Sequence, residues 1–280
     1  MNTVYTIINT IMPFDFMQYE FMKNAFLAIL IITPLLALIG VHIVNNKMAF
    51  FSDALGHSAL TGIAIGSILG ITNANISMCI FGAIFAIILN KIRRARILSS
   101  DTVISICSSF AVAIGLAILS KNGNFAKYSS YLIGDILSIK LGEIGLILLI
   151  FISVILFEIF TSNKMLAISI NKTMAKSKNI NVELIEDIFS IITALTIMLS
   201  IRWVGVLIIN ALLVIPVASA RNISKNAKEY TMYSVIFSLV SGIVGLIVSY
   251  YQEISTGPTI VIMSSAIFFI TYLMRRNVAK

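Results

Sequence analysis

An acidic residue and an imidazole lie one helical turn apart in the stretch FFSDALGHSALTGIAIG, residues 50–66. Residues four positions apart share one face of a helix, so Asp53 and His57 are expected to project side by side. A carboxylate with an imidazole is a donor pair that suits Zn²⁺ or Mn²⁺. One pair is an incomplete site, and two symmetric copies of the chain would supply four ligands. Two other interpretations stay open: a hydrogen bond that only locks packing, or Asp53 as a cap near the helix start.

Small residues follow this pair along the neighbouring row of the same helix. The row consists of Ala54, Ser58, Gly62 and Gly66. A small residue at every fourth position lets helices approach closely in lipid. We therefore expect another helix to pack tightly against this row, beside the face that carries the polar pair.

The composition indicates an integral membrane protein. The chain of 280 residues is 59% hydrophobic and 11% charged, whereas soluble domains are about one quarter charged. Its mean hydropathy is +1.00. We expect one all-α transmembrane domain over residues 1–280, a polytopic bundle of eight or nine transmembrane helices. The expected spans are 24–44, 52–70, 76–90, 102–120, 143–160, 184–201, 204–220, 231–250 and 258–274.

Three features of these spans carry further predictions. Residues 1–23 mix aromatic and charged side chains, which predicts an interfacial segment ahead of the first span. Spans six and seven meet at IRWVG, residues 201–205. Pro216 removes a backbone hydrogen bond within span seven and predicts a kink of the kind that borders gates.

Basic residues predict the orientation of the chain. The formal net charge is +8, which we assign to cytoplasmic loops rather than to nucleic-acid binding. Loops 91–96, 161–183 and 221–228 and the C-terminal tail are all rich in lysine and arginine. These segments alternate along a nine-span chain and therefore fall on one side, the cytoplasm, together with the C-terminus.

Four other residues are expected to be structural. His42 is interpreted as a packed or interfacial imidazole, and Glu158 as a residue that flanks the cytoplasmic end of a span. Cys79 and Cys107 lie inside apolar stretches and are interpreted as small buried hydrophobic residues.

Two stretches resemble the permease subunits of metal-ion ABC importers, the class that carries zinc, manganese or iron. MAFFSDALGHSALTGIAIG, residues 48–66, is similar to the signature of that family. VGVLIINALLVIPVASAR, residues 204–221, is similar to its late G-x-L-hydrophobic-A-L-L-x-x-P segment. The resemblance extends over nearly the whole chain in span order and loop size. It implies that Asp53 and His57 lie on the translocation pathway and coordinate the metal transiently, with no permanently bound cofactor.

The resemblance also implies partners in the cell membrane: a second copy of the chain, cytoplasmic ATPase subunits and an extracytoplasmic metal-binding protein. Loop 161–183 resembles the loop on which the ATPase docks, with Lys172, Ala175, Lys176 and Asn179 as docking residues. Asn179 stands where the family usually has glycine. The chain has no G-x-x-x-x-G-K-[ST] pattern, so we expect ATP hydrolysis on the partner and no enzymatic activity in this chain.

The residues leave two other functions to be weighed. A secondary cation transporter would use Asp53 as its coupling carboxylate, although we find no inverted repeat typical of such carriers. An intramembrane metalloenzyme needs three protein ligands and a base, and no H-E-x-x-H pattern is present. The expected function is therefore that of a permease subunit working by alternating access. The oxygen–nitrogen pair is compatible with Mn²⁺, Zn²⁺ and Fe²⁺ and does not choose among them.

Overall fold

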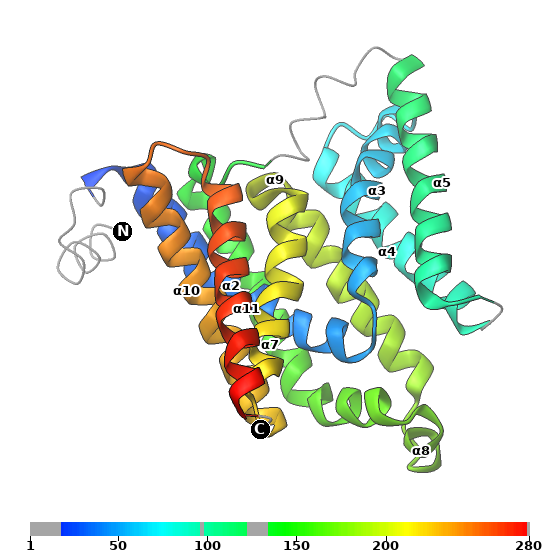
Figure 1. The fold of residues 1–280 in the computed structure, drawn as a ribbon. Helices are drawn as coiled ribbons and strands as arrows, with labels where there is room; N and C mark the ends of the chain where they lie inside the picture. Colours follow the sequence, from blue (N-terminus) through cyan, green and yellow to red (C-terminus); the bar gives the residue numbers. More distant parts are fainter. Residues whose placement is uncertain (1–17, 96–97, 122–133, 279–280) are drawn as a thin grey trace.

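The computed structural model describes residues 18–95, 98–121 and 134–278, which contain helices and their connections and no strand (Figure 1). Its long helices are α2 (Glu20–Asn45), α3 (Ala49–Ile68), α4 (Ala74–Arg94), α5 (Ser100–Lys121), α7 (Leu141–Ile170), α9 (Val182–Ile223), α10 (Ala227–Tyr251) and α11 (Thr256–Val278). The short helices η2 (Ile136–Ser138) and α8 (Lys172–Ser177) lie in the connections. The predicted all-α class is confirmed.

Seven helices in the described ranges are long and apolar enough to cross a membrane. Helix α3 is not among them, since Asp53, His57 and several small residues lower its hydropathy, yet most of its residues are buried. The eight long helices become nine apolar segments when the two halves of α9 are counted separately. This agrees with the predicted eight or nine transmembrane helices.

Helix α9 consists of two helices joined at Gly205. The dihedral angles of Gly205 are φ 80° and ψ 159°, a conformation that is essentially restricted to glycine. In Figure 1 the first half rises from α8 to the α9 label and the yellow second half descends again, so the chain reverses direction. The expected meeting of two spans at residues 201–205 is confirmed. The break lies at Gly205 and not at Pro216, around which α9 keeps helical dihedral angles, so a gating role for Pro216 stays a prediction.

Helices α2 and α9 form the interior of the bundle, and most of their apolar side chains are buried. Helix α3 packs against α4, α5 and α9. The other long helices present large apolar side chains outward, among them Phe110, Leu149, Phe160 and Phe269. Such outward-facing apolar surfaces are suited to lipid rather than to water.

The basic loops gather at one end of the bundle. One pocket at this end is lined by Asn46, Arg93 and Lys172 among others. Another is lined by residues that include Lys47 and Arg221. Helix α8 and the C-terminus lie at this lower end in Figure 1, whereas α10 connects to α11 at the upper end. The loops therefore share one end as the charge pattern predicts, and the assignment of that end to the cytoplasm stays a prediction.

Two predicted boundaries differ from the structure. Residues 1–17 lie outside the described part, and the rest of the expected interfacial segment 1–23 already enters α2, which begins at Glu20. The expected loop 161–183 is helical at its start, because α7 continues to Ile170 before the chain turns into α8.

Candidate metal site and docking region

Helix α3 presents the polar pair on one face. Asp53 Oδ1 lies 3.4 Å from His57 Nε2, and the two side chains are 50% and 49% exposed. Both groups are therefore accessible to an ion in a single copy of the chain. Over residues 18–95, 98–121 and 134–278, no further histidine, cysteine or acidic residue joins them in a cluster of metal-ligand type. The described part of one chain thus offers a carboxylate and an imidazole as a set of two ligands.

The geometry bears on the two structural interpretations of the pair. Met48 is the N-cap residue of α3, and Asp53 lies inside the helix, so the interpretation of Asp53 as a cap is wrong. The separation of 3.4 Å between Asp53 Oδ1 and His57 Nε2 is longer than a good hydrogen bond. A tight packing hydrogen bond between the two side chains is therefore not what the structure shows.

An amide from the second half of α9 reaches the same carboxylate. Asn210 Nδ2 donates a hydrogen bond of 2.7 Å to Asp53 Oδ1. Within the described residues, the side-chain oxygen of Asn210 is buried without a hydrogen-bond partner. The two helices are in close contact here, since a Cβ on Gly56 would lie 2.7 Å from Cγ1 of Val206. Asn210 was not among the predicted site residues, although an amide side chain within an apolar span is a signal that could have identified it.

A pocket of about 550 Å³ opens beside Asp53 between α3 and α5. Its walls include Phe50, Asp53 and Ala54 from α3 and Asp101 from the first turn of α5. Two carboxylates on the walls of one pocket attract cations and disfavour anions. The pocket therefore gives a positively charged ion a favourable approach to Asp53.

The two glycines of the small-residue row, Gly62 and Gly66, face α4 of the same chain. A Cβ on Gly62 would lie 3.0 Å from Cβ of Phe81 and 3.1 Å from Cα of Met78. A Cβ on Gly66 would collide with the hydroxyl of Ser77, which donates a short hydrogen bond to the carbonyl of Gly62. The other members of the row, Ala54 and Ser58, are buried as well.

Helix α8 ends in a tight turn with a recognisable hydrogen-bond pattern. The backbone N–H of Ile180 donates to the carbonyl of Ala175 and that of Asn179 to the carbonyl of Lys176, at 3.2 and 3.0 Å. This is the Schellman pattern, which requires a left-handed residue after the cap. Asn179 takes that position with φ 57°. Asparagine tolerates this conformation better than most residues other than glycine, so Asn179 is compatible with this turn.

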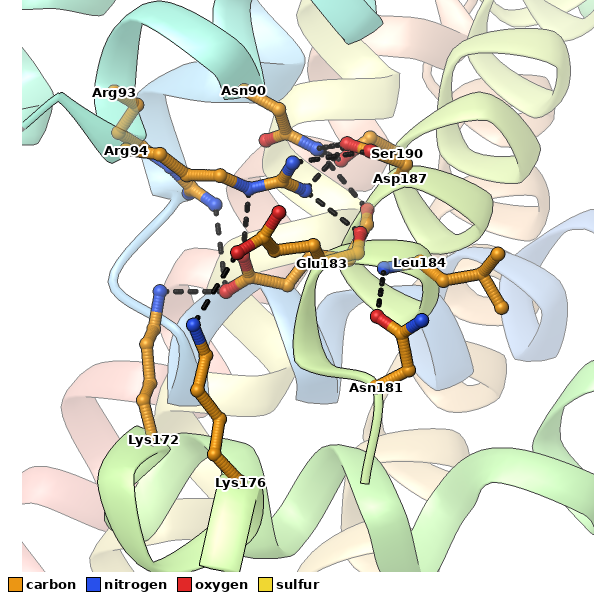
Figure 2. Close-up of polar contacts among 11 residues, drawn as sticks. Asn90, Arg93, Arg94, Lys172, Lys176, Asn181, Glu183, Leu184, Asp187 and Ser190 are labelled. Carbon is orange, nitrogen blue, oxygen red and sulfur yellow. Dashed lines mark hydrogen bonds and ion pairs between the residues drawn. The ribbon is translucent and has the colours of Figure 1, made fainter. Parts of the chain in front are cut away.

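Ion pairs attach α8 to α9, and α9 in turn to α4 (Figure 2). The carboxylate of Glu186 in α9 is only 6% exposed and receives Lys172 Nζ at 2.6 Å. It also lies 3.4 Å from Arg94 Nε and 3.9 Å from a guanidinium nitrogen of Arg93. Arg94 in turn pairs with Asp187 at 2.6 Å. The buried carboxylate of Glu186 therefore contacts three cationic side chains, two from α4 and one from α8.

An outer pair and a buried amide complete this charged cluster. Lys176 Nζ lies 3.3 Å from Glu183 Oε1, and both side chains are more than half exposed. On the inner side, Asn90 of α4 donates hydrogen bonds to Ser190 Oγ at 2.6 Å and to the carbonyl of Glu186 at 3.1 Å. Helix α8 is thus held by ion pairs to the start of α9, which is in turn paired with the end of α4.

The second histidine is part of a buried pair. His42 Nε2 of α2 lies 2.7 Å from Glu158 Oε2 of α7, and the imidazole packs edge-on against Phe189. His42 is packed as we expected. Glu158 lies inside α7 and pairs with the last turn of α2, and its place at the cytoplasmic end of a span stays a prediction.

A bundle of long apolar helices with its basic loops at one end defines a polytopic membrane protein. The model of the ABC 3 transport family matches residues 18–275, and the chain belongs to this family. The resemblance found in the sequence is therefore confirmed.

Relatives and a solved structure cover nearly the whole chain. The high-affinity zinc uptake system membrane protein ZnuB of Haemophilus influenzae is 31% identical, over 93% of this chain and 100% of that protein. The manganese transport system membrane protein MntC of Listeria innocua is 27% identical, over 92% of this chain and 91% of that protein. The structure of PsaBC from Streptococcus pneumoniae in complex with Fab covers 97% of this chain and 95% of that one. Its TM-score of 0.79 at 23% identity is a similarity of fold.

Proposed function

We propose that the chain is the permease subunit of an ATP-driven importer of divalent transition-metal ions, with Zn²⁺ and Mn²⁺ as the first candidates and Fe²⁺ as a third. The observation that carries the proposal is the accessible Asp53–His57 pair on α3, supported from α9 by Asn210. The relatives named for zinc and manganese support the substrate class. Membership of the ABC 3 transport family does not favour a secondary transporter that couples through Asp53.

The transported ion binds transiently between two copies of the chain, each contributing one carboxylate and one imidazole. Asp53 attracts the cation by its charge, and neutral His57 offers a nitrogen lone pair. A set of two oxygens and two nitrogens suits four-coordinate Zn²⁺. Added water molecules raise the number of ligands to that of an octahedral ion. The site holds the ion only weakly, because an ion that binds too tightly cannot leave.

The chain lies in the cell membrane, with the basic end of the bundle in the cytoplasm, where the ATPase binds. The ATPase docks on α8 and its turn, around Lys172, Ala175, Lys176 and Asn179. A metal-binding protein delivers the ion at the opposite end. When nucleotide binding moves α8, the charged cluster transmits this movement to α4 and α9, which pack against α3. The rearrangement exposes the metal site to one side of the membrane and then to the other. Pro216 in the second half of α9 is a candidate for the gate.

The decisive experiment measures metal uptake into vesicles that hold the chain with its ATPase and binding protein. Asp53→Ala and His57→Ala should abolish or strongly reduce uptake while the assembled complex keeps its ATPase subunits. Asp53→Asn tests charge at nearly constant size, and uptake should fall as well. The matched control is Asp135→Asn, since an asparagine can still accept the hydrogen bond that Asp135 receives from the backbone of Leu137.

Two results would contradict the proposal. Normal import by both alanine variants would show that the pair has no role in transport. Uphill, ATP-dependent uptake by the purified chain alone would exclude a permease that depends on a separate ATPase.

A further inference from the structure

Asn210 is placed to act on the metal site from another helix. It follows the Gly205 break in α9, and its amide nitrogen donates to Asp53 Oδ1 at 2.7 Å. A carboxylate on a free side chain rotates among several positions, whereas one held by an amide from a packed helix keeps one orientation. Hydrogen bonds of this kind to a ligating carboxylate orient it and tune the metal site.

The cost of burying Asn210 supports a role beyond packing. Its side-chain oxygen is buried and has no hydrogen-bond partner within the described residues. An unsatisfied amide group at such a position destabilises the fold, and an apolar side chain such as leucine would avoid the penalty. The contact between α3 and α9 is already supplied by Gly56 and Val206. The polar contact to Asp53 is therefore the feature that an amide adds at this position.

The distance between Asp53 Oδ1, which Asn210 holds, and His57 Nε2 matches the separation of two ligands on a tetrahedral metal ion. Asp53 Oδ1 and His57 Nε2 are 3.4 Å apart. Two ligands with bonds of about 2.1 Å are separated by about 3.4 Å on a tetrahedral ion such as Zn²⁺. At the same bond length, neighbouring ligands on an octahedral ion are about 3.0 Å apart.

We propose that Asn210 is a positioning residue for the metal site, which holds Asp53 at a tetrahedral distance from His57 and so favours Zn²⁺ over Mn²⁺. This inference rests on the proposed function, because it assumes that the Asp53–His57 pair binds the transported ion. Asn210 itself acts through Asp53. Substitution of Asn210 leaves both ligands, Asp53 and His57, present but changes their arrangement. It should therefore change the ratio of zinc to manganese affinity more than it abolishes metal binding.

The test measures metal binding to the purified chain in lipid nanodiscs by equilibrium dialysis. Radioactive Zn²⁺ is bound in the presence of increasing unlabelled Mn²⁺, which reports the preference within each folded preparation. Asn210→Leu removes the amide but keeps the same number of side-chain heavy atoms, Asn210→Ala removes it without added bulk, and Asn210→Gln retains a donor. Asn222→Leu is the matched control, because it places the same substitution near the end of the same helix, where Asn222 contacts Thr271.

We expect Asn210→Leu and Asn210→Ala to lower the affinity for zinc by about 10- to 100-fold, with a smaller effect on manganese. Asn210→Gln and Asn222→Leu should keep the preference of the unmodified chain. An unchanged ratio of zinc to manganese affinity in both amide-free variants would overturn the inference, as would a preference of the unmodified chain for manganese. Asp53→Ala separates the two proposals: zinc binding that survives this substitution contradicts the metal site itself, whereas its loss beside an unchanged Asn210→Leu contradicts only the role of Asn210.

Discussion

Lys172 in α8 and Glu186 in α9 form an ion pair of 2.6 Å that joins the proposed docking helix to the interior of the bundle. The carboxylate of Glu186 is 6% exposed and also contacts both arginines at the end of α4. Helix α4 packs against α3 through Gly62 and Gly66, and α9 contacts α3 through Asn210. The pair is therefore the first link in a continuous set of contacts from α8 to the proposed metal site.

Replacement of Glu186 by glutamine should destabilise the chain and uncouple it from ATP hydrolysis. The substitution leaves Arg93 buried without its neutralising partner, and breaking a buried ion pair costs about 3–5 kcal/mol. We expect a lower unfolding temperature in detergent. In the assembled complex, we expect ATP hydrolysis to continue while metal uptake per ATP falls. Thermal unfolding and parallel assays of hydrolysis and uptake measure these effects.

Glu183→Gln is the matched control for this prediction. Glu183 lies one turn earlier in the same helix, and both it and its partner Lys176 are more than half exposed. Exposed pairs contribute about 0–1 kcal/mol, so this variant should unfold near the temperature of the unmodified chain. Equal effects of the two substitutions would show that burial of Glu186 has no special role.

The pair of His42 and Glu158 should contribute to stability as a unit. His42→Ala leaves the carboxylate of Glu158 largely buried without its partner, and Glu158→Ala leaves the imidazole of His42 in the same condition. Each single variant should lose about 2–5 kcal/mol, and the double variant should lose clearly less than the sum. Thermal unfolding of the four proteins measures this coupling. Additive losses would mean that the two residues stabilise the chain independently.

Local sequence patterns predicted the elements of this fold more reliably than the contacts between them. Hydropathy located the spans to within a few residues, and the stretch 201–205 marked the point where α9 reverses direction. The spacing of Asp53 and His57 placed them on one face. Charge misplaced one boundary, because Lys164 and the polar residues around it suggested the end of a span that continues to Ile170.

The contacts between distant residues could not be predicted from one sequence. Asn210 lies 157 positions after Asp53, and Glu158 lies 116 positions after His42. Each contact depends on which helices are neighbours and on how each is rotated about its axis. Helices α2 and α9 are apolar on nearly all sides because they are buried, so their sequences do not indicate which face meets which neighbour.

The proposed orientation predicts labelling of opposite ends of the bundle from opposite sides of the membrane. Ser177→Cys at the end of α8 and Ser255→Cys between α10 and α11 are matched substitutions at exposed positions. Both are made after Cys79 and Cys107 are replaced by serine. An impermeant maleimide should label position 255 in right-side-out vesicles and position 177 only in inside-out vesicles. The opposite pattern would reverse the orientation and remove α8 from the reach of a cytoplasmic ATPase.

Replacement of Gly62 by leucine should separate α3 from α4 and impair transport. A Cβ at this position already lies 3.1 Å from Cα of Met78, and a helix backbone cannot move aside as a flexible side chain can. We expect a loss of about 1–3 kcal/mol from overpacking and a lower rate of metal uptake. Gly145→Leu is the matched control, because nothing lies within 4 Å of a Cβ on this exposed glycine of α7. Thermal unfolding and uptake should therefore change in the first variant and stay near normal in the second. Normal behaviour of Gly62→Leu would mean that α4 does not constrain α3, and the proposed route from α8 through α4 to the metal site would then lose its last contact.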